Sequence, residues 1–238
     1  MNILITGGAS GLGLAITKQL AAVSSNNLLI TYSGSKAVAE ELSKESNIES
    51  IHCDYSSRQD LNELLLRIED FSVDAVIHNA FSSFSIKHFH KLTISDFSDG
   101  FEKNVLPLIQ ITQAAVKVFR QKKQGKIVTI LTSFLADKPP VGLSQYVATK
   151  AYVHSLVKSW ASEYNKFNVT SNGVSPSFML TDMNSDTDER TIEQLEKSSP
   201  FGHFVQPNEV AKSVAFMINS SDGINGVNLI LNQGSSIK

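Results

Sequence analysis

The chain has 238 residues, a formal net charge of −2 and 18% charged residues, and these values bound its class. The near-neutral charge argues against nucleic acid or an anionic membrane surface as an electrostatic partner. No apolar run approaches the ~18 residues of a transmembrane helix, and we expect no signal peptide. Cys53 is the only cysteine, which excludes an intrachain disulfide and favours a cytoplasmic location.

The length of the chain and its lack of linkers bear on how many domains it forms. Its length allows one α/β domain or two small ones. Because there is no repeat, low-complexity tract or obvious linker, we expect a single domain over residues 1–238.

A glycine-rich turn lies between the first predicted strand, residues 3–6, and a predicted helix over residues 14–22. Gly7 permits a tight turn, Gly11 allows a pyrophosphate to approach the backbone, and Gly13 allows close packing of helix on strand. Backbone N–H groups and the helix dipole at such a turn form an anion site. The spacing is GxxxGxG rather than GxGxxG, so the usual dinucleotide fingerprint is not met literally.

The segment after the second predicted strand, residues 27–31, bears on the choice of cofactor. A carboxylate about 20 residues past the glycines would bind the adenosine ribose 2′-hydroxyl of NAD. None occurs here, and the hydroxyls of Ser33 and Ser35 with Lys36 suit a 2′-phosphate, which favours NADP over NAD. Alternatively, the segment is an ordinary turn in which Ser35 caps the next helix.

The next elements are a helix over residues 37–46, a strand over 49–53, a helix over 57–70 and a strand over 73–78. Asp54, at the carboxyl end of its strand, could accept a hydrogen bond from an adenine amino group or cap the following helix. Residues 81–92 show no clear period. His78, His88 and His90 supply no defined ligand set, so no metal site is expected.

Residues 96–121 carry apolar side chains at helical spacing, with a break or kink expected at Pro107. Asn104 is a polar residue within this apolar segment. It either faces solvent or bonds locally, or it orients water or backbone beside Lys150.

A tyrosine and a lysine share one face of the helix predicted over residues 145–167, one turn apart. The Lys150 ammonium would lower the pKa of the Tyr146 phenol, which could then exchange a proton with a carbonyl or alcohol oxygen. Ser133 follows a buried strand over residues 127–131 and could hydrogen-bond the same oxygen. Alternatively, Tyr146 and Lys150 are exposed residues on a helix face and Ser133 merely ends a strand.

A long polar insertion, residues 176–200, separates a strand over 169–174 from a helix over 207–219 and a strand over 227–231. It is too long for a simple connection, so residues 178–200 are a candidate substrate lid. Its second half could form a short helix that directs Ile192 and Leu195 inward. Phe178, Met179 and Met183 would add an apolar wall; alternatively, the segment is a disordered surface loop.

Strands that alternate with helices throughout predict an α/β fold with a doubly wound parallel sheet, of Rossmann type, with about seven strands and helices on both faces.

Over essentially its whole length the chain resembles the short-chain dehydrogenase/reductase family. The turn beginning at Thr6 matches TGxxxGxG, residues 176–183 resemble PGxxxTxM, and residues 199–203 and 207–211 resemble the family's late helix entry. The resemblance implies a catalytic tetrad of Asn104, Ser133, Tyr146 and Lys150. The cofactor-binding positions it implies are Gly7, Ser10, Gly11, Leu12, Gly13, Ser33, Ser35, Lys36, Asp54, Tyr55, Asn79, Ala80, Tyr146, Lys150, Pro176 and Thr181.

The resemblance implies an NAD(P)-dependent oxidoreductase that transfers hydride between nicotinamide and a small carbonyl or secondary alcohol substrate. Tyr146 would exchange the proton, Ser133 would hold the substrate oxygen, and Lys150 would bond the nicotinamide ribose, supported by Asn104 through water. The sequence is most similar to the 3-oxoacyl-carrier-protein-reductase-like branch, which suggests a 3-oxoacyl thioester. The alternative is a nucleotide-sensing binding protein with little turnover; fold and cofactor site alone do not name a substrate.

Members of this family mostly pair through the helices corresponding to residues 96–121 and 145–167, so a homodimer or homotetramer is expected. The apolar residues expected to supply that surface are Val105, Ile109, Val116, Val153, Leu156 and Trp160. Two positions depart from the family pattern: Phe81 stands where NNAG has its glycine, and Ser177 replaces the glycine of the PG motif. Both lie where the resemblance places the nicotinamide half of the cofactor.

Overall fold

The computed structural model describes residues 1–82, 84, 86–181 and 188–237. This part of the chain contains a sheet of seven parallel strands in the order β3-β2-β1-β4-β5-β6-β7. The strands are β1 (Asn2–Ile5), β2 (Asn27–Tyr32), β3 (Ile48–His52), β4 (Ala75–His78), β5 (Gly125–Ile130), β6 (Val169–Pro176) and β7 (Asn228–Leu231). The α-helices are α1 (Gly11–Ala21), α2 (Lys36–Leu42), α3 (Arg58–Phe71), α4 (Ile94–Asn104), α5 (Leu106–Lys122), α6 (Ser144–Tyr164), α7 (Glu189–Ser198) and α8 (Pro207–Asn219).

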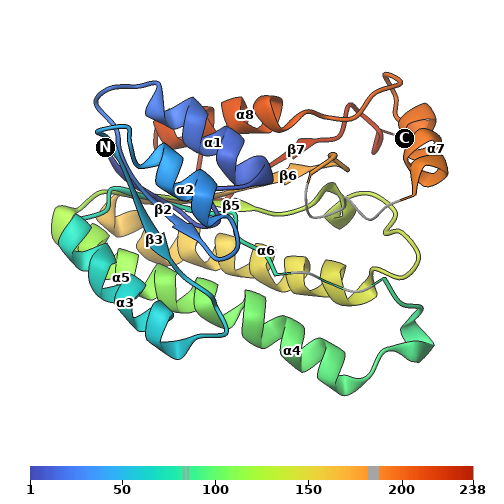
Figure 1. Ribbon diagram of the computed structural model, residues 1–238, viewed down its shortest axis with the longest axis horizontal. Helices are drawn as coiled ribbons and strands as arrows, with labels where there is room; N and C mark the ends of the chain where they lie inside the picture. The colour runs from blue at the N-terminus through green and yellow to red at the C-terminus, as the bar shows by residue number, and fades with distance from the viewer. Residues whose placement is uncertain (83, 85, 182–187, 238) are drawn as a thin grey trace.

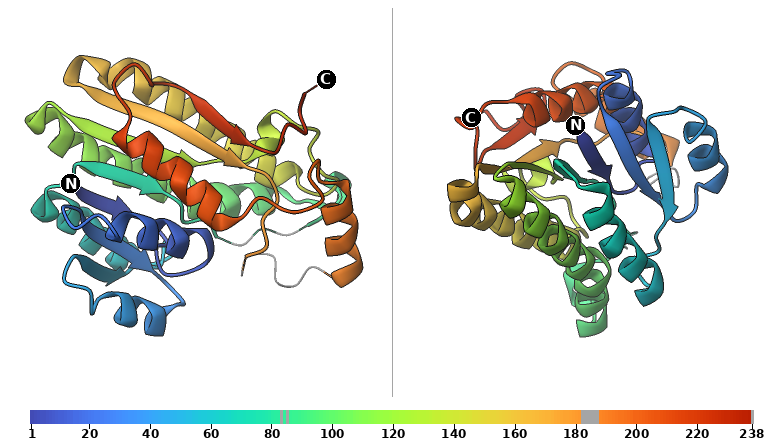
Figure 2. Two further views of the ribbon diagram at one scale, coloured as in Figure 1. Left: turned by 90° about the horizontal axis from the view of Figure 1, so that it is seen from above. Right: turned by 90° about the vertical axis from the view of Figure 1, so that its left-hand side faces the viewer.

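Helices cover both faces of the sheet, with α1, α2 and α8 on one face and α3, α5 and α6 on the other (Figures 1 and 2). Because successive side chains of a strand point to opposite faces, each strand contributes to the hydrophobic core on both faces of the sheet. In β1, Ile3 and Ile5 pack in the core beneath α1 and α8, whereas Leu4 packs in the core beneath α3 and α5. Burial on both faces explains the continuous apolar runs within strands such as β1, β2 and β4.

The strand order reverses beside β1, which pairs with β2 on one side and with β4 on the other. In open α/β sheets, ligands bind at such a switch point, beyond the carboxyl ends of the strands. The glycine turn follows β1 here and Asn79 follows β4, so both lie at this point. The predicted doubly wound parallel fold is therefore confirmed.

Two predicted helical segments are confirmed with changed boundaries. The segment predicted over residues 96–121 is two helices, α4 and α5, which meet at Val105. Pro107 lies in the first turn of α5, where proline has no helical N–H bond to lose. A capping box between Thr93 and Asp96 begins α4. The short helix expected in the long insertion is α7, at the end of the molecule to which the carboxyl ends of the strands point (Figure 1).

The rest of the predicted lid is only partly visible. Residues 182–187, including Met183, lie outside the described residues, so that part of the prediction has no structural counterpart here. Within the described part of the chain, no helix combines the length and apolar character needed to cross a membrane.

Candidate active site

A cleft of about 1540 Å³ opens at the carboxyl edge of the sheet. Segments that follow β1, β2, β4, β5 and β6 line it, together with part of α7 and the segment after β7. Single-ligand pockets occupy roughly 300–1,000 Å³, so this cleft has room for two ligands side by side. The predicted site residues among its lining are Gly7, Ser10, Gly11, Leu12, Gly13, Ser33, Ser35, Asn79, Ala80, Ser133, Tyr146, Lys150, Pro176 and Thr181.

The turn after β1 requires glycine at two positions. Gly7 has φ +66°, and its N–H donates to Thr31 Oγ1 at 2.9 Å, which closes the turn against β2. A Cβ at Gly13 would lie 1.9 Å from the Gly7 carbonyl oxygen, so only glycine allows α1 to begin this close to β1. The first N–H groups of α1, which have no partner within the helix, face this cleft edge and suit a pyrophosphate.

Asn79 joins the end of β4 to the same turn. Its Nδ2 donates to the Thr6 carbonyl at 3.0 Å and to the Gly7 carbonyl at 3.2 Å. Thr6 Oγ1 in turn accepts from the backbone N–H groups of Asn79 and Ala80, both at 3.0 Å. These bonds hold the two strands of the switch point in one register at the cleft.

The segment after β2 brings Ser33 and Ser35 to the cleft, but not Lys36. The Lys36 ammonium instead lies 3.7 Å from the Glu40 carboxylate on the exposed surface of α2. Ser35 occupies the N-cap position of α2 without a side-chain capping bond, so the alternative capping role for its hydroxyl is wrong. A cleft-lining residue missed from the sequence is Tyr32, whose ring packs edge-on to His52; its position at the end of β2 was the available signal.

Asp54 and Tyr55 follow β3 but do not line the cleft. Asp54 Oδ1 accepts from the N–H of Ser56 at 2.8 Å and from its hydroxyl at 2.7 Å, which forms a local turn. The cap of α3 is Ser57, whose hydroxyl accepts from the Asp60 N–H, so the alternative role of Asp54 as that cap is wrong.

Ser133 and Tyr146 both line the cleft, from two different elements. Ser133 begins a short 3₁₀ helix, Ser133–Leu135, directly after β5, and Tyr146 lies in the first turn of α6. Five buried side-chain oxygens in the described part of the chain have no hydrogen-bond partner, and Ser133 Oγ is the one among them that lines the cleft. A buried hydroxyl without a partner costs free energy unless a ligand supplies one.

The environment of Lys150 differs from the prediction. Its Nζ donates to the Ile130 carbonyl at 2.8 Å and lies 4.4 Å from the centroid of the Phe81 ring, against 6.0 Å from that of Tyr146. Burial lowers the pKa of Lys150 to about 7.

The expected lowering of the Tyr146 pKa by Lys150 is wrong. Burial raises the pKa of the phenol, because exclusion of water disfavours the phenolate, and a hydrogen bond with Thr132 only partly offsets this. The rings of Phe81 and Phe84 supply much of that burial, with centroids 5.3 and 4.5 Å from that of Tyr146. Phe84, like Tyr32, is a site residue that the sequence reasoning missed.

Asn104 is buried at the end of α4 rather than solvent-facing. Its Oδ1 accepts from the Ser82 N–H at 2.6 Å, and its Nδ2 donates to the Gly100 carbonyl at 3.1 Å. The bond to Gly100 is local, as one interpretation of its role expects, and the bond from Ser82 orients the backbone that follows β4, as the other expects. Asn104 is not among the residues that line the cleft.

The far wall of the cleft is apolar. Phe178 and Met179 line it after β6, Leu195 reaches it from α7, and the Phe178 ring packs on Phe204 at 5.0 Å. A Cβ at Gly11 would lie 3.5 Å from Thr181 Cβ, so the segment after β6 crosses the glycine turn. Ile192, which was expected to face inward with Leu195, is half-buried but does not line the cleft.

The histidines do not form a metal site in the described part of the chain, where no three potential ligands gather. His78 is buried, and its Nε2 lies 2.9 Å from Thr112 Oγ1. Burial lowers the pKa of His78 to about 3, so this imidazole is neutral at physiological pH.

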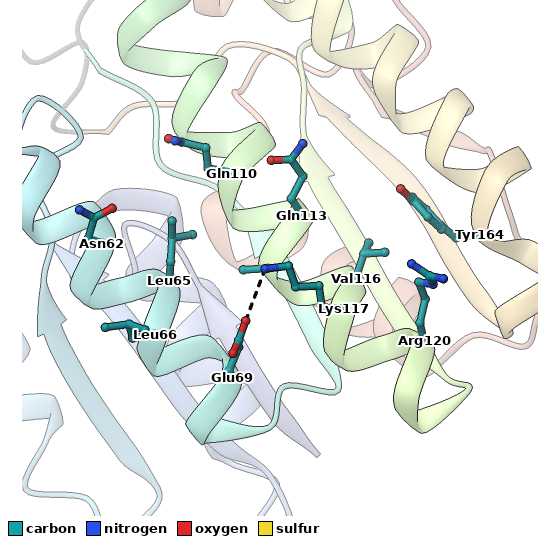
Figure 3. Close-up of a pocket in the computed structure, with 11 residues that line it drawn as sticks. Asn62, Leu65, Leu66, Glu69, Gln110, Gln113, Val116, Lys117, Arg120 and Tyr164 are labelled. Carbon is teal, nitrogen blue, oxygen red and sulfur yellow. Dashed lines mark ion pairs between the residues drawn. The ribbon is translucent and has the colours of Figure 1, made fainter.

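A second hollow, of about 780 Å³, lies on the outer surface between α3 and α5 (Figure 3). Polar side chains such as Gln110 and Gln113 point into it from α5, and Lys117 pairs with Glu69 at 3.7 Å. It brings together none of the predicted site residues.

The apolar residues expected at a subunit interface are mostly internal. Val105, Val116, Val153 and Trp160 are buried within the chain, because they belong to the hydrophobic core on this face of the sheet. That part of the prediction is wrong. Ile109 and Leu156 are partly exposed.

Comparisons with known proteins agree with the geometry of the cleft. A family model described as enoyl-(acyl carrier protein) reductase matches residues 7–236. The 3-oxoacyl-[acyl-carrier-protein] reductase FabG of Aquifex aeolicus is 29% identical over 220 residues, which cover 90% of this chain and 88% of that protein. Carbonyl reductase family member 4 of Xenopus laevis is 32% identical over 228 residues, which cover 91% of this chain and 90% of that protein.

Solved structures share the fold. A short chain dehydrogenase from Burkholderia cenocepacia in complex with NADP superposes with a TM-score of 0.83 at 26% identity, covering 97% of this chain and 96% of the other. An actinorhodin polyketide ketoreductase with NADPH superposes with a TM-score of 0.88 at 23% identity, covering 100% and 97%. The family model spans nearly the whole chain, and the curated relatives match it over nine-tenths of its length. The chain therefore belongs to the short-chain dehydrogenase/reductase family, on its 3-oxoacyl-[acyl-carrier-protein]-reductase-like branch, and is an NAD(P)-dependent oxidoreductase acting on carbonyl or alcohol groups.

Proposed function

We propose that this protein reduces the carbonyl group of a small molecule with NADPH, and that Ser133, Tyr146 and Lys150 carry the reaction. The observation on which the proposal rests most is the buried, unpartnered Ser133 Oγ at the end of the cleft that Tyr146 also lines. A substrate carbonyl oxygen would satisfy that hydroxyl and receive a proton from the tyrosine.

The raised pKa of Tyr146 keeps the phenol protonated at neutral pH, as a proton donor in carbonyl reduction must be. A phenol that keeps its proton at pH 7 can donate it to an oxygen that becomes an alkoxide. The nicotinamide, when bound, supplies the hydride to the carbonyl carbon. Lys150, buried against the Ile130 carbonyl, would bond the nicotinamide ribose and keep that half of the cofactor beside Tyr146.

The cleft fits a dinucleotide along one side. The N-terminus of α1 with Gly11, Leu12 and Gly13 would hold the pyrophosphate, and Asn79 and Ala80 would lie along the nicotinamide half. The preference for NADPH is supported by Ser33 and Ser35, which reach the adenine end without a neighbouring carboxylate in their segment. Lys36 contributes little here, because its ammonium pairs with Glu40 away from the cleft.

We further propose a substrate with an apolar portion next to its carbonyl, such as a 3-oxoacyl thioester. The lining of the cleft beyond Tyr146 supports this with Phe134, Val141, Phe178 and Leu195. The Aquifex aeolicus relative, a 3-oxoacyl-[acyl-carrier-protein] reductase, supports the same substrate class. The described part of the predicted lid, which follows β6 and includes α7, would form one wall around this portion.

We propose a homodimer or homotetramer as the functional unit, with α5 and α6 at the interface. Leu106 on α5 and Tyr152 on α6 are each 43% exposed, and the partly exposed Ile109 and Leu156 lie on the same two helices. These residues support the proposal in place of the buried valines and Trp160. The chain itself is proposed to act as one catalytic domain.

A substrate panel with purified protein tests the reaction. It compares aliphatic 3-oxoacyl thioesters, small polar ketones and enoyl thioesters, each with NADPH and with NADH, and follows loss of the reduced nicotinamide. We expect turnover with the 3-oxoacyl thioesters and NADPH, and loss of that turnover in Tyr146→Phe. Binding of NADPH without turnover of any compound would instead support a nucleotide-sensing protein, and reduction of only the enoyl compounds would reject carbonyl chemistry.

A further inference from the structure

The aromatic ring of Phe81 lies against Lys150, the cleft lysine that takes part in the proposed function. The ring centroid lies 4.4 Å from Lys150 Nζ, within the range of a cation–π contact, and 5.3 Å from the Tyr146 ring, nearly perpendicular to it. One N–H of the ammonium donates to the Ile130 carbonyl. Lys150 is therefore only 7% exposed although it lines the cleft.

The backbone holds Phe81 in this position from both sides. Before it, the Ala80 N–H donates to Thr6 Oγ1 at 3.0 Å. After it, the Ser82 N–H donates to Asn104 Oδ1 at 2.6 Å, and Asn104 is itself buried and bonded to Gly100. Because the neighbouring amides are anchored, the ring can leave Lys150 by side-chain rotation while the backbone stays in place.

We propose that Phe81 is an affinity-determining residue that covers the Lys150 ammonium and competes with the nicotinamide ribose for it. This inference rests on the proposed function, in which Lys150 bonds the ribose hydroxyls. The ring and a ribose cannot both occupy the cleft side of Lys150, so the ring must rotate away before the lysine can bond the cofactor. Phe84, whose ring lies edge-on to that of Phe81 at 6.3 Å between centroids, limits the directions in which the Phe81 ring can turn.

Competition of this kind lowers the apparent affinity for the cofactor. The bound arrangement is reached only from the fraction of molecules in which the ring has left Lys150, and apparent Kd rises by the inverse of that fraction. Cation–π attraction between a lysine and a phenylalanine corresponds to a factor of about 2 to 30 in this equilibrium. The same contact shields the lysine from solvent and from other reagents.

The first experiment measures how strongly Phe81 shields Lys150 when no cofactor is present. Amine-reactive labelling of Lys150, followed by mass spectrometry of the folded protein, reports how accessible the ammonium is. We expect Phe81→Ala to label Lys150 several-fold faster than wild type. Phe89→Ala is the matched control, since Phe89 is 71% exposed in the following segment and should leave the rate unchanged. Equal rates in wild type and Phe81→Ala would overturn the proposal.

The second experiment measures the Kd of NADPH by its fluorescence in a double-mutant cycle at pH 6, where Lys150, with a pKa of about 7, is mostly charged. Phe81→Ala should bind about 2- to 30-fold more tightly than wild type. The gain should disappear in the Lys150→Met background, because there is no ammonium left to compete for. A gain that persists without Lys150 would show that Phe81 acts only through its bulk, contrary to the proposal.

Two further outcomes separate this inference from the proposed function. If wild type binds NADPH and Phe81→Ala binds it no more tightly, competition at Lys150 is wrong while the reductase assignment stands. If neither protein binds NADPH or NADH, the proposed function fails and the competition fails with it. Should Phe81→Ala not fold, as judged by circular dichroism, Phe81→Leu replaces it in the double-mutant cycle, because leucine keeps apolar bulk but presents no ring face to the ammonium.

Discussion

The Lys150 ammonium donates a 2.8 Å hydrogen bond to the carbonyl of Ile130, the last residue of β5. This bond holds a buried titratable group at the wall of the cleft. A buried amine keeps its charge less readily than one in water, and burial lowers the pKa of Lys150 to about 7. The state of this lysine should therefore be visible in the stability of the whole domain.

We expect the free energy of unfolding to rise with pH through this group. Because the folded pKa is about 7 and an unfolded lysine titrates near ~10.4, the unfolded chain binds more protons between these values, and stability increases from the lower to the higher. Between about pH 6 and about pH 9 the difference in unfolding free energy between wild type and Lys150→Met should grow by about 2–3 kcal/mol in favour of wild type. Urea unfolding of both proteins measures this, and a constant difference across the range would refute it.

Tyr146→Phe should abolish most turnover while leaving fold and cofactor affinity intact. The change removes the proton donor and almost no volume, and general acid catalysis typically contributes ~10²–10⁴-fold. Steady-state kcat on an active ketone and NADPH titration measure the two effects. Tyr152→Phe, an exposed tyrosine of the same helix, is the control. A Tyr146→Phe enzyme with wild-type kcat would exclude the tyrosine as proton donor.

NADPH should bind more tightly than NADH, and Ser33→Asp should reduce or reverse that preference. A carboxylate at the end of β2 repels a 2′-phosphate and can bond a 2′-hydroxyl. Lys36→Ala is the control and should change the ratio of the two Kd values little, because Lys36 does not line the cleft. Tighter binding of NADH by wild type would reject the assignment.

Leu195→Asp should raise KM for a long-chain substrate more than for a short one. Leu195 lines the cleft from α7, so a charge there meets the apolar part of the substrate. Gln194→Asp tests the same charge one position away on an exposed residue that does not line the cleft. Equal effects of the two substitutions on KM would mean that α7 does not contact substrate.

Sedimentation should show a dimer or tetramer at micromolar concentration, and Leu106→Glu with Tyr152→Glu should shift it toward monomer. Both side chains are 43% exposed, on α5 and α6, and a buried unpaired charge at an interface is costly. Val23→Glu, a change at an exposed apolar residue after α1, is the control. A wild-type protein that sediments only as a monomer would contradict the proposed interface.

Much of the fold could be predicted because most strands contain a short apolar run between polar turns. The seven predicted strands all occur, with ends shifted by one or two residues, and Pro107 correctly marked the division between α4 and α5. Helix ends were predicted less accurately. The helix predicted over residues 37–46 ends at Leu42, before its last polar residues.

The part of the site that could be predicted is the part that local sequence spacing determines. Tyr146 and Lys150 lie one turn apart on α6, so their shared face needs no long-range information, whereas the position of Ser133 beside the same cleft depends on the fold. The direction of the Tyr146 pKa could not be predicted, because it depends on rings that arrive from the segment after β4 and exclude water. Similarly, periodicity shows that α6 has an apolar face but not whether Trp160 packs on the sheet or on a second subunit.

The hydrogen bonds from the Asn79 carboxamide to the carbonyls of Thr6 and Gly7 have an entropic consequence. A glycine-rich loop is costly to order, since each residue fixed in one backbone conformation loses roughly 1–2 kcal/mol. Here the glycine-rich turn is ordered when the protein folds, through contacts between β1, β2 and β4. It does not have to be ordered when an anion binds. An Asn79→Ala protein should therefore bind nucleotide with a more unfavourable entropy, measurable by calorimetry, because the turn would have to be ordered by the ligand itself.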